Sequence, residues 1–304
     1  MSDPIARPRP RDPEPRSRLG PPSSAALAAV ALLLAAGVAG CGLISGKQRN
    51  EAIALYESGK LTEAIPKLKS ALRSRPGDSE TRRFLALALT KNGDGNEAID
   101  EWLRVLKADP SSADGHYWLG IAYLSTNRRE RAMQEWVKTI GLDSTHVSAH
   151  YNLGFAYAQM GIVPLAVEQW SQLLQVDPTH YDGRVNRGRL RVLQGDFLGG
   201  LEDFLIALAV KPDEELNWLC VGESYFLLDD SARAVSHIDS FLVYRVEEDE
   251  MAFRARELRR RIVAGEKAPT SKTSSLGIVP RDLSGLVGPD SGAAAPAPSD
   301  STLE

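Results

Sequence analysis

Cysteine and excess charge are both scarce in this chain, and each shortage excludes a class of protein. Two cysteines in 304 residues, Cys41 and Cys220, cannot make a disulfide framework. A formal net charge of −4 leaves no strongly basic domain, which nucleic-acid binding would require. The hydrophobic and charged fractions, 43% and 25%, are ordinary for a soluble protein of ample length. A folded chain that does not bind nucleic acid is therefore expected.

Recognisable catalytic motifs are also missing. The sequence contains no H-E-x-x-H, phosphate-binding loop or G-x-S-x-G elbow. His146 and His150 lie four residues apart, but a metal site would need further ligands. Both histidines recur one period of 34 residues away, as His180 and His116, so a repeat explains them. We expect no catalytic, metal or cofactor site. An enzyme with its chemistry in atypical repeats is kept only as a less favoured class.

The N-terminal segment reads as an export signal. Residues 2–22 hold seven of the eighteen prolines, with several arginines, and should be unfolded. An apolar run over 25–44 follows and contains Val38-Ala39-Gly40-Cys41. Basic residues, an apolar run and small residues before a cut form a secretory signal. The last four residues resemble the lipobox of bacterial lipoproteins.

That resemblance implies a signal peptide over 1–40, removal of it, and a lipid on the thiol of Cys41 beside a short tether at 41–47. The alternative is an uncleaved membrane span, since the run has about the 20 residues that a bilayer requires. Either arrangement exports everything after Cys41. Gly42 at the next position resembles the pattern that sends lipoproteins to the outer membrane, so we expect a lipid-anchored protein that faces the periplasm.

A 34-residue repeat organises the rest of the chain. Residues 113–146 and 147–180 align without a gap, so that Leu119, Gly120 and Trp136 fall on Leu153, Gly154 and Trp170. Extending the period gives six units, at 45–78, 79–112, 113–146, 147–180, 181–214 and 215–248. A fixed period of this length indicates a repeat architecture.

The pattern resembles the tetratricopeptide repeat, a helical hairpin with the signature W-x2-L-G-x2-Y, A-x3-F and P. The resemblance implies an all-α, right-handed solenoid of six hairpins. In each hairpin a small residue at the eighth position, such as Gly120, faces another at the twentieth, such as Ala132. A large apolar residue at the twenty-fourth position, such as Trp136, then fills the space between units.

The ends of the array and its fifth unit carry further expectations. Each unit buries its apolar face only against its neighbours, so residues 249–264 are expected to form a capping helix with a solvated arginine face. Residues 265–304 have few large apolar side chains and should be disordered. In the fifth unit Arg184, Arg187 and Arg191 replace more apolar residues, which favours a locally loosened unit over a buried anion site.

The candidate partner site is the concave face lined by the first helices. On helical spacing, the second, fifth, sixth, ninth, twelfth and thirteenth positions of each unit project toward it. The residues expected to bind a partner there are Arg83, Tyr117, Trp118, Ile121, Tyr151, Asn152, Phe155 and Asn186. The middle is aromatic and suits an apolar segment, and an asparagine amide can pair with any peptide unit. Some of these aromatics could instead pack against neighbouring first helices.

These observations favour a non-enzymatic scaffold or assembly factor in the bacterial envelope, with another envelope protein as its partner. The anchor, the number of repeats and their order resemble the type IV pilus pilotin, which assists assembly of the outer-membrane secretin. The other scaffold hypothesis is an adaptor lipoprotein for a cell-wall synthesis or hydrolysis complex.

Overall fold

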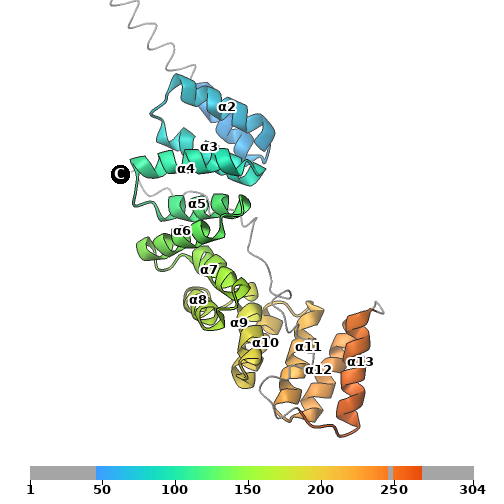
Figure 1. Cartoon of the computed structure of the whole chain (residues 1–304). Helices are drawn as coiled ribbons and strands as arrows, with labels where there is room; N and C mark the ends of the chain where they lie inside the picture. Colours follow the sequence, from blue (N-terminus) through green and yellow to red (C-terminus); the bar gives the residue numbers. More distant parts are fainter. Residues whose placement is uncertain (1–45, 246–248, 269–304) are drawn as a thin grey trace, which may run out of the picture.

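The computed structural model describes residues 46–245 and 249–268, and every regular element in those ranges is a helix (Figure 1). The first helix covers 46–57. The others are α2 (Leu61–Ser74), α3 (Ser79–Asn92), α4 (Gly95–Ala108), α5 (Ala113–Ser125), α6 (Arg129–Leu142), α7 (Val147–Gln159), α8 (Val163–Val176), α9 (Tyr181–Leu193), α10 (Phe197–Val210), α11 (Glu215–Leu227), α12 (Ser231–Tyr244) and α13 (Glu250–Val263).

The helices form antiparallel hairpins that stack in one curved row from α2 to α13 (Figure 1). From α2 onward, each helix packs against the one before it and the one after it in the chain. The predicted all-α solenoid of helical hairpins is confirmed. Cys41, the apolar run and the segment after Ala268 lie outside the described residues. No helix among the described residues has the length and apolar character that crossing a membrane would take.

Local sequence fixes where the first helices begin. The residue before the helix accepts a hydrogen bond from the backbone N–H three residues on, which satisfies an amide that the helix leaves unpaired. Asp78 and Ser112 do this for α3 and α5, and the Nδ1 atoms of His146 and His180 do it for α7 and α9. The two histidines of the repeat's last position are therefore helix caps.

The turn inside each hairpin needs one residue in the left-handed region. Gly59, Gly93, Gly161 and Gly195 supply it with φ between 73° and 88°. At the equivalent place in the third and sixth units stand Asn127 and Asp229, with φ of 60° and 61°. Short polar side chains tolerate this conformation better than other non-glycine residues, so the turn keeps its shape in all six units.

The core is built from the predicted small and large positions. Trp102, Trp136 and Trp170 are at most 1% exposed. A Cβ on Gly120 would stand 2.4 Å from Nε1 of Trp136, so only glycine allows α5 and α6 to approach this closely. The three tryptophans are packing residues, in line with the alignment of the repeats.

A polar clasp at the fourth and twenty-third positions joins the two helices of four successive hairpins. Its side-chain pairs are Arg82–Glu101 at 2.8 Å, His116–Glu135 at 2.6 Å, His150–Gln169 at 2.9 Å and Arg184–Asp203 at 3.0 Å. The fourth-position side chain also bonds the carbonyl oxygen six residues earlier, on the loop from the preceding unit. In the sixth unit Trp218 bonds that carbonyl of Pro212, and its ring lies 5.7 Å from that of His237.

The last helix, α13, covers the apolar face of α12. Its Ala255, Leu258 and Ile262 are buried in one cluster with Ile238 and Phe241 of α12. Its arginines lie on the outer side and pair with carboxylates, Arg259 with Asp239 and Arg260 with Glu257. This arrangement gives α13 the properties of a capping helix.

Candidate functional site

Two of the predicted groove aromatics are buried. Tyr117 is 6% exposed and Tyr151 2% exposed, so neither presents an open ring on the concave face. Each packs near the histidine cap of the next unit, with ring centroids 4.7 Å apart for Tyr117 and His146 and 5.3 Å apart for Tyr151 and His180. Their expected placement as exposed partner contacts is wrong, and the alternative of packing between first helices is what the structure shows.

The predicted asparagines are buried as well, because they bond to those tyrosines. Asn152 Nδ2 donates to the hydroxyl of Tyr117 at 3.4 Å, and Asn186 Nδ2 donates to that of Tyr151 at 3.2 Å. Both bonds join neighbouring first helices across 35 residues. Asn152 is 2% exposed and Asn186 is fully buried. The amides are therefore oriented by the fold, with the carbonyl end left for a further contact in Asn152.

The other predicted residues lie at the surface of the groove. Trp118, Ile121 and Phe155 are partly buried side chains next to the core. Arg83 is partly buried on α3, with its guanidinium 5.9 Å from the ring centroid of Phe84. Arg83 and Asn186 are on other units than the pocket described next, so the structure does not bring all eight predicted residues into one site.

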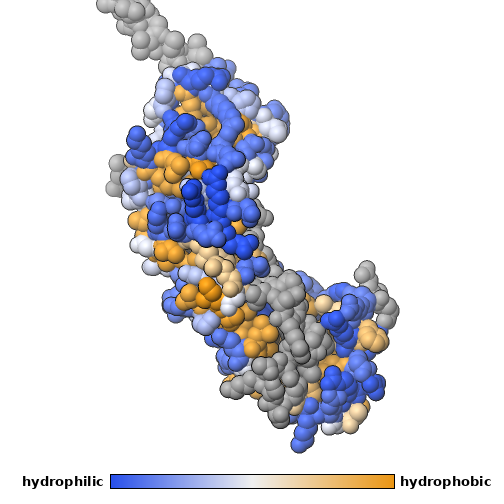
Figure 2. Space-filling view, viewed as in Figure 1, coloured by the Kyte–Doolittle hydropathy of each residue, from blue (hydrophilic) through white to orange (hydrophobic). Residues whose placement is uncertain are grey.

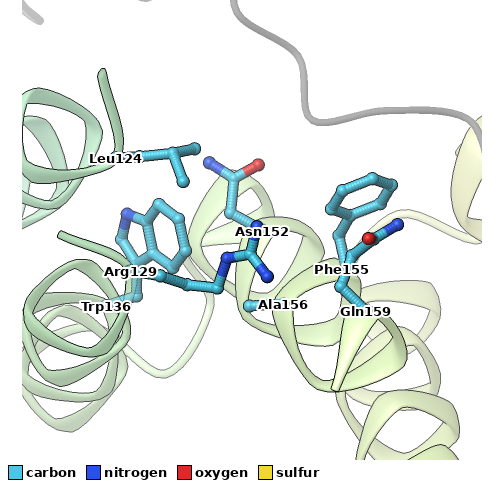
Figure 3. Close-up of a pocket in the computed structure, with 7 residues that line it drawn as sticks. All are labelled: Leu124, Arg129, Trp136, Asn152, Phe155, Ala156 and Gln159. Carbon is cyan, nitrogen blue, oxygen red and sulfur yellow. The ribbon is translucent and has the colours of Figure 1, made fainter. Parts of the chain in front are cut away.

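A pocket of about 200 Å³ lies between the third and fourth hairpins (Figure 3). Figure 3 shows Leu124 and Trp136 on one side of it, Phe155 and Gln159 on the other, and Asn152 and Arg129 between them. The full lining is Leu124, Arg129, Trp136, Asn152, Phe155, Ala156 and Gln159. Only Asn152 and Phe155 belong to the predicted set. Arg129 and Gln159 come from helix ends, where the groove positions of the repeat do not by themselves indicate a pocket.

The chemistry of this pocket is that of an apolar cavity with one buried acceptor. Oδ1 of Asn152 has no hydrogen-bond partner among the described residues. Arg129 is exposed and forms no ion pair within the described part of the chain. A buried acceptor without a donor is unfavourable, so an occupant that brings an N–H and an apolar side chain would gain from both.

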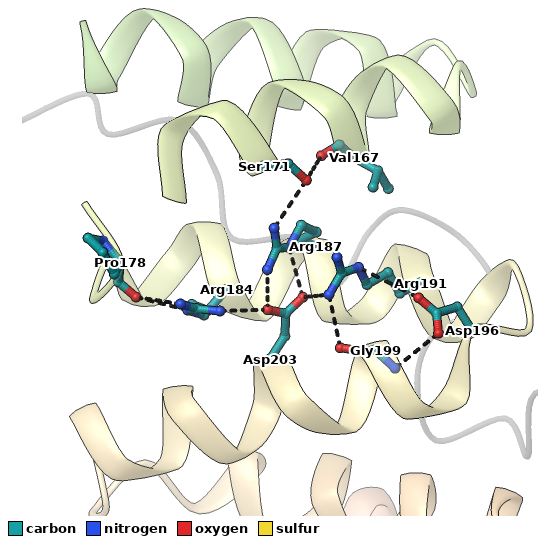
Figure 4. Close-up of polar contacts among 9 residues, drawn as sticks. All are labelled: Val167, Ser171, Pro178, Arg184, Arg187, Arg191, Asp196, Gly199 and Asp203. Atoms are coloured by element: carbon teal, nitrogen blue, oxygen red, sulfur yellow. Dashed lines mark hydrogen bonds and ion pairs between the residues drawn. The ribbon is translucent and has the colours of Figure 1, made fainter. Parts of the chain in front are cut away.

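The fifth hairpin holds a buried carboxylate that sequence reasoning missed (Figure 4). Asp203 on α10 is fully buried. It accepts hydrogen bonds from Arg184 at 3.0 Å, from Arg187 at 2.9 and 2.6 Å, and from Arg191 at 3.1 Å. The expectation of a locally loosened unit is therefore wrong, because the three arginines converge on one acceptor. The spacing of 19 residues that recurs in the other clasps was the available signal.

Arg189, between these arginines in sequence, points elsewhere and is not satisfied. It is 6% exposed, and its Nε and Nη1 have no hydrogen-bond partner among the described residues. Nearby, burial raises the pKa of the Cys220 thiol to about 11, with Arg189 opposing this shift and Glu223 adding to it. Cys220 is therefore a buried neutral thiol that behaves as a small apolar residue.

Other surfaces offer no chemical site. Within 46–245 and 249–268, no three histidine, cysteine or acidic side chains gather as metal ligands would. His150 is held by Gln169 and by the carbonyl of Ser144, as a clasp residue. Figure 2 shows hydrophobic patches broken up by hydrophilic surface along the row of hairpins.

Comparisons with known proteins agree with this fold. Residues 49–106 match the family described as Tetratricopeptide repeat, and residues 86–127 match the one described as TPR repeat. Together these matches support tetratricopeptide repeats over residues 49–127. No curated protein matches the chain.

Solved structures extend the likeness as a fold. The structure titled "Functional Characterization of Pseudomonas Aeruginosa pilF" is 16% identical, with a TM-score of 0.57 over 73% of this chain and 99% of that one. A tetratricopeptide repeat protein from Parabacteroides merdae is 17% identical, with a TM-score of 0.53 over 73% of this chain and 87% of that one. YrrB, described as a TPR protein with an unusual peptide-binding site, is 16% identical, with a TM-score of 0.54 over 64% and 97%. At these identities the similarity establishes the helical-hairpin solenoid alone.

Proposed function

We propose that the chain is a non-enzymatic scaffold of the bacterial envelope, which holds a segment of a partner protein in its concave groove. The pocket at Asn152 and Phe155 is the observation that carries this proposal. It combines an apolar cavity, a buried acceptor without a donor and an exposed arginine at one edge. A peptide supplies all that such a surface lacks, because it brings side chains and backbone N–H groups together.

The test is capture of the partner by crosslinking in native membranes. The variant Phe155→Ala with Arg129→Ala alters the pocket without touching the buried Tyr117 or Tyr151, so the fold should persist. We expect at least a tenfold loss of the main crosslinked partner. The matched control, Phe253→Ala with Arg260→Ala, removes the same residue types from the exposed side of α13. Equal capture by both variants would place the partner on another surface.

The anchor is proposed from the lipobox resemblance of residues 38–41. Labelling with palmitate in cells should reach the wild-type chain and disappear in Cys41→Ala, because only that thiol is available for the lipid. The variant should also leave the membrane fraction. A variant that stays embedded in the membrane without label would indicate the uncleaved signal anchor instead.

The scaffold role that we propose in finer detail is that of a type IV pilus pilotin. The anchor, the six repeats and their order support it, and the P. aeruginosa pilF structure is a suitable comparator because the fold matches over 99% of that chain. Cells without the protein should lose assembled secretin, and wild-type protein, but not Cys41→Ala, should restore it. Normal secretin with altered cell-wall synthesis would favour the adaptor hypothesis.

A further inference from the structure

Two buried polar groups on neighbouring first helices lack partners. One is Oδ1 of Asn152 on α7, and the other is the pair of guanidinium nitrogens Nε and Nη1 of Arg189 on α9. Both side chains are more than nine-tenths buried. Buried polar groups are nearly always hydrogen-bonded in native proteins, and a buried charge without a counterion is more costly still. Their partners must therefore come from outside the described residues.

The repeat places the two groups in one line. Phe155, beside Asn152 in the pocket, and Arg189 are both ninth-position residues, 34 apart. The helices that carry them are neighbours, since Asn186 of α9 donates to Tyr151 of α7 at 3.2 Å. Helices in such contact have axes about 10 Å apart. An extended peptide advances about 3.3 Å per residue, so it covers this step in about three residues.

Charge then selects the chemistry of the occupant. The ninth-position row runs from Ile121 and Phe155 to Arg189, which is apolar up to the pocket and cationic one unit later. A fitting segment carries an apolar side chain, two further residues and then a carboxylate. The carboxylate would bond the free nitrogens of Arg189, and the backbone beside the apolar residue would donate to Asn152.

The chain itself contains this pattern twice, outside the described residues. Val279-Pro280-Arg281-Asp282 is one copy, and Val287-Gly288-Pro289-Asp290 is the other. We propose that residues 276–290 of the same chain occupy the groove between the pocket at Phe155 and Arg189. From Ala268 to Val279 the chain can extend about 36 Å, more than the roughly 20 Å spanned by two units. A tethered segment has a high effective concentration, so even weak contacts fill the site.

Occupation by this segment makes the groove self-covered until a partner displaces it. The inference relies on the groove binding peptide, as the proposed function does, and adds which peptide holds it in the free protein. It deals with purified chain alone, whereas the proposed function concerns a partner in membranes.

The first experiment uses the purified full chain with a benzoylphenylalanine photocrosslinker at Gln159, an exposed residue that lines the pocket. At low protein concentration, the expected crosslink joins the probe to residues 276–290 within one chain, identified by peptide mass spectrometry. The control probe stands at Glu168, an exposed position on α8 outside the lining of the pocket, and should give less than a tenth of that yield. Equal yields from the two probes would overturn the proposal, as would a crosslink to another segment or between two chains.

The second experiment tests the sequence dependence. Asp282→Asn with Asp290→Asn should lower the Gln159 crosslink at least fivefold, because an amide is a poorer acceptor for a buried guanidinium than a carboxylate. Asp300→Asn, another tail acid outside the pattern, should leave the yield unchanged. These variants do not alter the described fold. An unchanged yield in the double variant would refute the role of Arg189.

Failure here and failure of the proposed function can be told apart. Loss of partner capture in Phe155→Ala with Arg129→Ala, without any tail crosslink, would keep the scaffold and refute self-occupation. A tail crosslink that depends on Asp282 and Asp290, without any membrane partner, would do the reverse.

Discussion

The fourth and fifth hairpins share a backbone but differ in what they bury. In the fourth, the clasp is His150 with Gln169, and the adjoining groove has a pocket with a buried acceptor. In the fifth, the same two positions carry Arg184 and Asp203, and two more arginines converge on that carboxylate. The repeat geometry thus fixes where a clasp forms, while its residue types set how much charge is buried.

The energetic consequences of the two clasps differ. A neutral hydrogen bond contributes about 1 kcal/mol, and its loss leaves groups that can turn toward water. A buried carboxylate with three guanidinium partners is an all-or-none arrangement, since removing the acceptor leaves cations without compensation. The fifth hairpin should therefore be the more sensitive of the two to a single change.

Replacing the shared acceptor should give the largest effect. We expect Asp203→Ala to lower the free energy of unfolding by about 3 to 5 kcal/mol, because it strands buried charge on Arg187 and its neighbours. Urea unfolding followed by circular dichroism measures this loss. The matched change in the fourth unit, Gln169→Ala, should cost about 1 kcal/mol. Similar losses in both variants would show that the charged clasp has no special weight.

The apolar frame of these hairpins could be predicted from the sequence alone. A period of 34 residues places Gly154 against Trp170 and Gly188 against Phe204, since small and large residues at fixed positions have one way to pack. Residues at the ninth position, such as Phe155, could be predicted as groove residues for the same reason.

The polar contacts could not be predicted in the same way. Tyr151 is buried because Asn186 bonds its hydroxyl from the next unit, and periodicity gives a position's face without giving its partner. Asp203 looks like an ordinary helix-surface residue until the arginines of α9 lie over it. The pocket depends on Arg129 and Gln159 at helix ends, where small differences in helix length decide whether side chains meet.

The packing frame should respond alike in the two units. A Cβ on Gly154 would stand 2.7 Å from Nε1 of Trp170, and one on Gly188 would stand 2.9 Å from a ring carbon of Phe204. Over-packing of this kind costs about 1 to 3 kcal/mol, so Gly154→Ala and Gly188→Ala should each lose that much in urea unfolding. Gly141→Ala has no atom within 4 Å and should leave stability unchanged or raise it by up to ~1 kcal/mol. A large loss in only one of the two hairpins would mean that their frames differ.

The smallest expected difference lies in the histidine caps. His146 of the fourth unit has a carboxylate within 3.5 Å, Asp114, whereas Ser148 stands at the equivalent place before His180. A hydrogen bond with His146 holds the pKa of Asp114 below its ordinary 3.8. The carboxylate form therefore stabilises the folded state above that pH, and the contribution is lost as pH falls toward the lower, folded value.

Asp114→Asn should accordingly be less stable than the wild type near pH 6 and equal to it at pH values well below 3.8. The side chain of Asp114 is 68% exposed, so solvent screening keeps the difference under about 0.5 kcal/mol. Urea unfolding of both proteins across this pH range measures it, and Ser148→Ala serves as the control without a charge. A difference that persists unchanged in acid would mean that Asp114 acts through packing, since protonation would then leave its contribution intact.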